Sequence, residues 1–375
     1  MTQSMRLGIP CGPRDRERLD RYVKLFLPRL KEIGWDGILE FKTDQITEDQ
    51  EWVRYAVEVA EAHGIAIQWH VNDYFFSKIG RGLTVEKATE YLSRADWLVK
   101  NHACKIVMHF GTACWDTPDE PCEPMLLPLK SERYNSPIDA EEYLRLINEH
   151  VEFIKGLVSY YGDPSVILGE NTACFLTGIA QYMGMQVGVT QNVAVFTEQT
   201  GIGTCLDIEH HYENEWMLTR RKSAGFIEKA EVTNLTDVQR QCQTVSGIMI
   251  EQGKPPYVPD DAFDINFAIE LMRPKCFHIG GTVDSLDEWG VLNAHLPIDT
   301  VEVAKHVDLP EVVKYIMANG GDMIVEANGG DFWKAAGYAC SPRIDDDEKA
   351  KWATLETTVK VIEMIIDGKY YSGRL

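Results

Sequence analysis

Short apolar runs recur along the chain, and longer segments with helical periodicity separate them. A run of four to eight apolar residues between polar or turn residues is typical of a strand that is buried on both faces. Such runs occupy residues 6–9, 37–41, 65–70, 105–109, 165–170, 203–207, 276–279 and 322–326. Apolar residues at helical spacing predict helices over residues 19–33, 49–62, 84–101, 141–160, 189–200 and 345–366. Thr84 is expected to be the N-cap of the third of these helices.

The alternation of eight strands with helical segments indicates βα units and a parallel sheet. Eight such units predict an α/β fold, a (β/α)₈ TIM barrel, as a single domain over residues 1–375. Its long loops, insertions at about 112–138 and 211–261, would lie at the C-terminal face. The alternative is an open doubly wound sheet. Against it, the turn after the first strand, Gly8–Pro13, lacks the glycine pattern that binds dinucleotides.

Composition narrows the class of protein. The 375 residues are 45% hydrophobic and 25% charged, which is typical of a globular protein with a large core. A net charge of −21 opposes broad electrostatic binding to nucleic acid. No apolar run approaches the roughly 18 residues of a membrane span. Nine cysteines without a Cys-x-x-Cys pair, and a first segment without a signal-peptide core, predict reduced thiols and a cytoplasmic location.

Six of the predicted strands end at, or within a residue of, a side chain that can ligate a metal. These residues are His70, His109, Glu170, Asp207, His278 and Glu326. In a barrel, the carboxyl ends of the strands converge on the face that carries active sites. Any one of these residues alone is more often a hydrogen-bonded core histidine or a capping carboxylate. Three carboxylates in one small space repel one another unless cations lie between them, so the set predicts a site with more than one divalent metal.

The chain resembles the endonuclease IV family, also called AP endonuclease family 2, within the xylose-isomerase-like TIM-barrel superfamily. The matching motifs follow the family order and span about residues 66–330. They are Trp69–Tyr74, Val107–Gly111, Glu170–Ala173, Cys205–His210, Phe277–Gly280, Leu292–His295 and Val325–Asn328. In combination the motifs are specific, although each alone is not.

The resemblance implies a trinuclear zinc site whose ligands carry over residue by residue. His70 and His109 would hold one metal, with Glu170 as the bridge to a second. Asp207, His278 and Glu326 would complete the second metal, and His210, Asn293 and His295 would hold a third. The family has an aspartate where this chain has Asn293. A neutral amide binds a divalent cation less strongly than a carboxylate, so the third site is expected to be the weakest.

Other departures from the family concern the substrate. The loop Asp116–Glu123 is acidic where the family has DNA-clamping basic residues, and Lys42 is the one cation expected in the loop after the second strand. Tyr74 lies one position later than the tyrosine that the family inserts into the duplex. The insertion at 211–261 would cover the mouth like a lid. These features favour a small-molecule sugar or phosphorylated substrate over duplex DNA, and no membrane partner is expected.

Two reactions fit this site. In the first, a metallohydrolase uses two to three Zn²⁺ or Mn²⁺ ions and a metal-activated water to cleave a phosphoester or sugar phosphate. In the second, a sugar isomerase or epimerase holds one metal on Glu170, Asp207, His278 and Glu326, and Glu170 and Glu326 act as the proton-transfer pair. The additional histidines exceed what one metal needs, so the sequence favours the hydrolase. It does not predict an oligomeric state.

Overall fold

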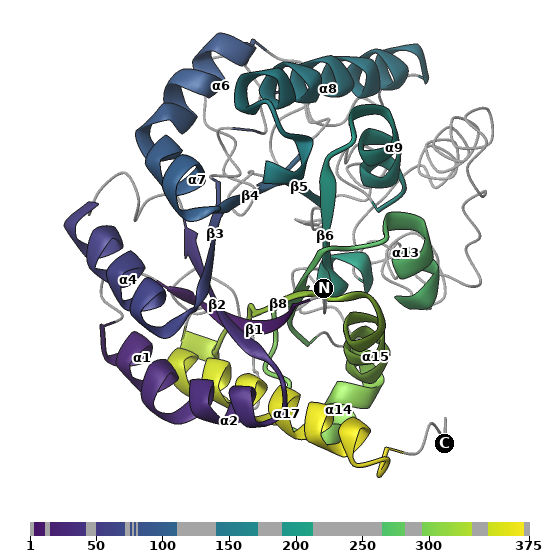
Figure 1. Cartoon of the computed structure of the whole chain (residues 1–375). Helices are drawn as coiled ribbons and strands as arrows, with labels where there is room; N and C mark the ends of the chain where they lie inside the picture. Colours follow the sequence, from purple (N-terminus) through teal and green to yellow (C-terminus); the bar gives the residue numbers. More distant parts are fainter. Residues whose placement is uncertain are drawn as a thin grey trace.

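The fold is a closed barrel of eight parallel strands with helices around its outside (Figure 1). The computed structural model describes residues 4–11, 16–42, 50–71, 76, 79, 82–110, 140–171, 190–212, 265–281, 295–331 and 344–370. The strands are β1 (Met5–Cys11), β2 (Asp36–Lys42), β3 (Ala66–His70), β4 (Lys105–His109), β5 (Ile167–Glu170), β6 (Gly203–Asp207), β7 (Cys276–Ile279) and β8 (Gly321–Val325). Each strand pairs with the next, and β8 pairs with β1. The predicted (β/α)₈ barrel is therefore confirmed.

The helices agree with the predicted periodicity in most places. They are α1 (Arg16–Arg21), α2 (Leu27–Glu32), α4 (Gln50–His63), α6 (Val85–Leu92), α7 (Asp96–His102), α8 (Ala140–Tyr161), α9 (Thr190–Thr200), α13 (Ile265–Met272), α14 (Val301–His306), α15 (Leu309–Asn319) and α17 (Asp347–Ile366). A π-helical turn joins α1 to α2, and a 3₁₀ turn joins α6 to α7. Thr84 caps α6, because its hydroxyl accepts a hydrogen bond from the Lys87 N–H at 3.3 Å. The sequence reasoning did not predict α13, α14 or α15.

Closure of the barrel depends on a glycine in β1. Gly8 pairs with Ile38 of β2 and with Ile324 of β8. A Cβ atom at Gly8 would lie 1.8 Å from the Ile38 carbonyl oxygen, far inside van der Waals contact. Only glycine lets the two strands approach this closely. Because the barrel is closed, the paired strands present no free edge.

Side chains fill the barrel interior in layers. At the amino-terminal end, Arg6 and Lys105 lie 3.0 Å and 3.6 Å from the two carboxylate oxygens of Asp322, which is buried. The next layer consists of small and branched apolar side chains, Ile38, Val107, Leu168, Cys205, Cys276 and Ile324. Two residues further along β5, β6 and β7, the inward positions carry Glu170, Asp207 and His278. The polar site therefore lies above a mainly apolar layer.

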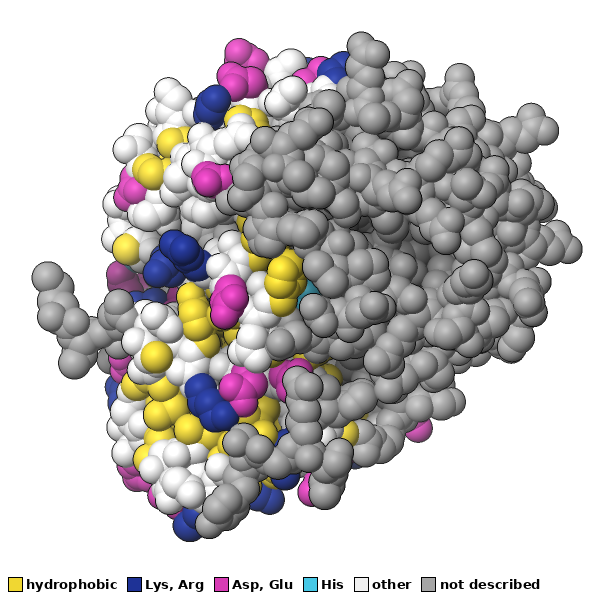
Figure 2. All heavy atoms as spheres, turned by 90° about the vertical axis from the view of Figure 1, so that its right-hand side faces the viewer, with side chains coloured by type: hydrophobic (Ala, Val, Ile, Leu, Met, Phe, Trp, Pro, Cys, Tyr) yellow, Lys and Arg dark blue, Asp and Glu magenta, His cyan; other side chains and the backbone are white. Residues whose placement is uncertain are grey.

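The outer surface carries charges of both signs. On the described part of the face in Figure 2, Lys and Arg side chains lie beside Asp and Glu side chains. Within the described residues, no helix is both long and apolar enough to cross a membrane. Nearly all of the two predicted insertions lies outside the described residues, and the prediction of one domain over the whole chain stays a prediction.

Candidate metal centre

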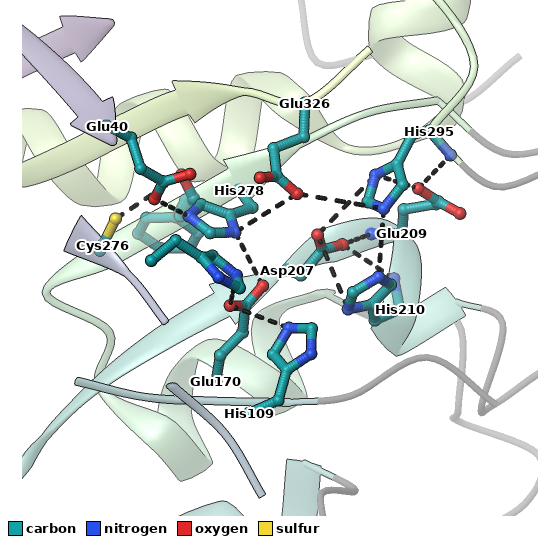
Figure 3. A network of polar contacts seen from close by, with 12 residues as sticks. Glu40, His109, Glu170, Asp207, Glu209, His210, Cys276, His278, His295 and Glu326 are labelled. Carbon is teal, nitrogen blue, oxygen red and sulfur yellow. Dashed lines mark hydrogen bonds and ion pairs between the residues drawn. The ribbon is translucent and has the colours of Figure 1, made fainter. Parts of the chain in front are cut away.

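The six strand-end residues predicted as ligands lie together at the carboxyl-terminal mouth of the barrel (Figure 3). Four of them end β3, β4, β5 and β6 in turn; these are His70, His109, Glu170 and Asp207. His278 is the third residue of β7, and Glu326 directly follows β8. All are buried except Glu326, whose side chain is 11% exposed. Their convergence follows from the parallel strand order.

Glu170 is the centre of this arrangement. Its Oε1 lies 2.7 Å from His278 Nδ1, and its Oε2 lies 3.0 Å from both His70 Nε2 and His109 Nε2. His70 Nδ1 lies 3.0 Å from the Val71 carbonyl oxygen, which can only accept a hydrogen bond, so Nδ1 carries the proton of a neutral ring. His70 Nε2 then directs a lone pair at a carboxylate oxygen. Only a proton or a cation between the two atoms makes this contact favourable.

Asp207 combines a structural role with a free oxygen. Its Oδ1 accepts hydrogen bonds at 2.9 Å from the backbone N–H groups of Glu209 and His210, and so caps the helical turn after β6. Asn171 holds the Asp207 backbone through two hydrogen bonds of 2.8 Å. Asp207 Oδ2 is buried and accepts no hydrogen bond from the described residues, although His210 Nδ1 lies 3.7 Å and His295 Nδ1 4.0 Å away. A buried carboxylate oxygen without a donor is costly unless a cation approaches it.

His210 and His295 face each other where the third metal is predicted. Their Nε2 atoms are 3.2 Å apart. His210 Nδ1 lies 2.9 Å from the Asn171 carbonyl oxygen, and His295 Nδ1 lies 2.7 Å from Glu209 Oε2. With protons on both Nδ1 atoms, the two Nε2 atoms face each other, and either a proton or one shared cation between them makes this contact favourable.

The backbone of His295 is strained. Its φ of 54° lies in the left-handed region, which costs of order 1 kcal/mol for a residue other than glycine. Two hydrogen bonds hold the backbone there: the His295 N–H donates to Glu209 Oε2, and the Asn328 N–H donates to the His295 carbonyl oxygen at 2.6 Å. Outliers of this kind cluster at functional sites, where the surrounding structure maintains them.

Two charged residues of β2 belong to the site, and the sequence reasoning missed this role for both. Glu40 is fully buried; its Oε2 lies 2.8 Å from His278 Nε2 and accepts a hydrogen bond from Gln68 Nε2 at 2.7 Å. Lys42 Nζ lies 2.9 Å from Glu40 Oε1 and also donates to Glu326 Oε1. The expectation that Lys42 belongs to a loop is wrong, because it is the last residue of β2.

Lys42 and Glu326 each stabilise the charged form of the other. Burial opposes the charge on Lys42, but Glu326 and Glu40 outweigh it and hold the pKa of the ammonium well above its usual range. Burial would raise the pKa of Glu326, but Lys42 and His278 lower it well below its usual range. Both groups are therefore charged at neutral pH, and Lys42 fixes one of the two oxygens of Glu326.

The donor set fits divalent cations. Four groups of side chains place one ligand atom each within 4.8 Å of one another: Glu170, Asp207, His278 and Glu326; Asp207, His210 and His295; His109, Glu170 and His210; and His70, Glu170 and His278. Imidazoles and carboxylates are the ligands that Zn²⁺ and Mn²⁺ accept. Glu40 contacts His278, and the Asn171 carbonyl oxygen contacts His210. Hydrogen bonds of this kind orient the ligating histidines of metal sites in other proteins. The role of these residues as ligands stays a proposal.

Several predicted features lie outside the described residues. These are Asn293, Tyr74 and the acidic segment 116–123. Of the three ligands predicted for the third metal, the structure describes His210 and His295 but not Asn293. His295 itself was predicted only through the family resemblance, since it lies on no strand or helix.

The fold and the site together define a (β/α)₈ barrel with a buried cluster of histidines and carboxylates at its mouth. No family model matches the chain, and no curated protein matches it. Among solved structures, it is similar to D-psicose 3-epimerase from Clostridium cellulolyticum, with 12% identity, 96% of this chain and 98% of that chain covered, and a TM-score of 0.46. It is also similar to the 3-keto-D-glucoside 4-epimerase of E. coli, with 11% identity, 96% of this chain and 99% of that chain covered, and a TM-score of 0.46.

A third similar structure is a Thermus thermophilus protein soaked with ZnCl₂, with 14% identity, coverages of 94% and 97%, and a TM-score of 0.43. At these identities and scores, the similarities carry no inference about activity. The strand order confirms the (β/α)₈ barrel, and the xylose-isomerase-like part of the resemblance stays a prediction from the motifs. The endonuclease IV part stays a prediction from the motifs.

Proposed function

We propose that this protein is a divalent-metal-dependent enzyme that isomerises or epimerises a small carbohydrate. The proposal starts from the group formed by Glu170, Asp207, His278 and Glu326, which supplies three carboxylates and one imidazole to a single position. A divalent ion held there would act as a Lewis acid on neighbouring substrate oxygens. The chain's own residues would orient the sugar and move the proton.

The position of Glu326 carries the proposal. Among the three carboxylates of this group, Glu170 and Asp207 are fully buried, whereas the Glu326 side chain is 11% exposed. Its Oε1 accepts from Lys42, and its Oε2 lies 3.6 Å from His278 Nδ1. Glu326 is therefore the ligand-set carboxylate that a substrate in the mouth can reach.

The proposed reaction proceeds by proton transfer at carbon. Glu326 removes a proton from the carbon next to the sugar carbonyl, and the electron pair of the broken C–H bond forms an enediolate. In an isomerisation the proton returns to the neighbouring carbon, and the hydroxyl proton passes to the former carbonyl oxygen. In an epimerisation a second carrier gives a proton to the opposite face of the same carbon, Glu326 releases its proton to solvent, and the second carrier regains a proton from solvent. Glu170 is the second proton carrier of the predicted pair. Both of its oxygens contact imidazoles, so it acts only if the substrate displaces one of these contacts.

Lys42 also bears on the substrate class. Lys42 is the lysine of the described part of the site, and it already pairs with Glu40 and Glu326. A phosphate group would compete with these two carboxylates for the same ammonium. The overall charge of −21 acts in the same direction. We therefore favour a neutral sugar over a sugar phosphate.

A metallohydrolase with two or three metals is the second candidate, and a specific observation supports it. The group Asp207, His210 and His295 and the group His109, Glu170 and His210 go beyond what one metal requires. The two oxygens of Glu170 contact histidines on different strands, as expected for a carboxylate that bridges two cations.

Solvent deuterium distinguishes the two reactions. We expect the protein, supplied with Mn²⁺ in D₂O, to exchange a carbon-bound proton of one sugar in a panel of aldoses and ketoses, followed by ¹H NMR. Glu326→Gln should abolish the exchange, while Glu58→Gln, on the exposed face of α4, should leave it unchanged. Cleavage of a phosphodiester by the same protein, with no exchange on any sugar, would refute the isomerase and establish the hydrolase.

A further inference from the structure

Two buried thiols lie directly beneath the proposed metal centre. Cys205 of β6 and Cys276 of β7 are paired in the strand register, and both are free and fully buried. Each precedes a proposed ligand by two residues, Asp207 on β6 and His278 on β7. Residues two apart on a strand point to the same face, so both thiols point into the barrel.

The two thiols approach an imidazole as well as each other. The sulfur atoms of Cys205 and Cys276 and one ring nitrogen of His278 lie within 4.8 Å of one another. The rest of this layer is apolar, apart from Gln68, whose Nε2 lies 3.5 Å from Cys276 Sγ. Figure 3 shows Cys276 on the Glu40 side of the cluster, away from His210 and His295. Two thiolates and one imidazole form a soft ligand set. The carboxylate-rich positions above them offer harder oxygen ligands.

Two simpler explanations of the pair are a disulfide and ordinary core packing. Side chains opposite each other on neighbouring parallel strands are separated by about the strand spacing, 4.7–4.9 Å, whereas a disulfide needs Cβ atoms about 3.5–4.5 Å apart. A bridging ion therefore suits the pair better than an S–S bond. Buried cysteines also serve as small apolar residues. Packing alone does not require a histidine nitrogen beside both sulfur atoms.

We propose that Cys205, Cys276 and His278 form a binding site for one thiophilic divalent cation, such as Cd²⁺ or Zn²⁺. Binding forms two metal–thiolate bonds and releases the two thiol protons to solvent. The two thiolate charges then neutralise the ion inside the apolar layer, which limits the cost of burying it.

The site is coupled to the metal centre above it through His278. One ring nitrogen of His278 lies 2.7 Å from Glu170, and the other lies 2.8 Å from Glu40. An ion on the two thiolates takes His278 away from one of these carboxylates. A thiophilic ion in the lower site therefore weakens the hold of the upper site on its own metal.

The test is a titration with Cd²⁺ in the presence of excess Mn²⁺, which occupies the carboxylate-rich positions. The ultraviolet thiolate-to-cadmium charge-transfer band reports only cysteine-bound ions, so the readout is independent of any catalytic activity. The double variant Cys205→Ser/Cys276→Ser should bind one equivalent of thiolate-ligated Cd²⁺ fewer than the wild type. The control Cys104→Ser removes another buried thiol and should match the wild type.

A second double variant, Cys205→Ala/Cys276→Val, keeps the layer apolar and guards against misfolding of the serine variant. It should lose the same equivalent while its near-ultraviolet circular dichroism stays that of the wild type. An equal number of thiolate-bound Cd²⁺ ions in the wild type and a folded double variant would overturn the proposal. A failure of this kind would leave the proposed isomerase untouched, since no step of that reaction uses either thiol.

Discussion

Replacement of Glu40 offers a sharp test of the metal centre, because Glu40 touches a proposed ligand without being one. Its Oε2 lies 2.8 Å from His278 Nε2, so a proton on Nε2 leaves the Nδ1 lone pair for a metal. The negative charge of Glu40 also makes the His278 imidazole a stronger electron-pair donor to a metal. Glu40→Gln keeps the shape and an acceptor oxygen but removes the charge, and Glu40→Leu removes both.

The magnitude follows from the contacts that each variant loses. Loss of such an outer partner typically weakens metal binding 10- to 100-fold, or about 1.4 to 2.8 kcal/mol. Because the amide retains one hydrogen bond, we expect about tenfold for Glu40→Gln. We expect about 100-fold for Glu40→Leu, which also leaves Gln68 Nε2 without its acceptor at 2.7 Å.

Competition with a fluorescent chelator for Mn²⁺ measures these dissociation constants. The matched control is Asp322→Asn, which neutralises a carboxylate buried to the same extent at the opposite end of the same barrel. It should lower stability while leaving metal affinity unchanged. An affinity of Glu40→Leu equal to that of the control would show that Glu40 does not orient His278 for a metal.

Three further predictions follow from charges already described. Lys42→Met removes the ammonium between Glu40 and Glu326 and should reduce turnover at least tenfold. Lys42→Arg keeps a cation there and should retain part of the turnover. Equal kcat values for the wild type and both variants would contradict the role of Lys42. Asp322→Ala leaves Arg6 and Lys105 without their carboxylate and should cost about 3 kcal/mol in chemical denaturation, and a cost below about 1 kcal/mol would show that the pair is dispensable. Burial opposes the charge of His295, but Glu209 outweighs it and raises its pKa from 6.5 to about 10. In chelator-treated protein this stabilisation is complete below pH 6.5 and is lost as pH rises toward 10, so the Tm should fall over that range and Mn²⁺ should restore it; a flat Tm would exclude this linkage.

The sequence predicted the barrel and the position of most site residues for one physical reason. Strands of a closed parallel sheet are buried on both faces, so they appear as apolar runs, and a ligand at the end of such a run stands out. Glu170 and Asp207 were found in this way. Glu40 was missed because it lies inside a strand, although Ile38, Glu40 and Lys42 share one face by their spacing of two.

Other features had a weaker signal or none. Helix α15 carries Leu309, Val312, Val313 and Ile316 at helical spacing, a signal that the sequence reasoning passed over, whereas α14 has only six residues. His295 lies in irregular backbone with a positive φ, and its place depends on contacts with Glu209 and Asn328 that are remote in sequence. Long-range contacts of this kind cannot be read from local periodicity.

The ionic layer at the foot of the barrel has a kinetic consequence. Arg6, Lys105 and Asp322 close the amino-terminal end, and the apolar layer lies directly above them. We therefore expect a cation and a substrate to reach the proposed site through the mouth. Because the two would share this passage, a bound substrate should cover the metal, and metal exchange at saturating substrate should be no faster than substrate release.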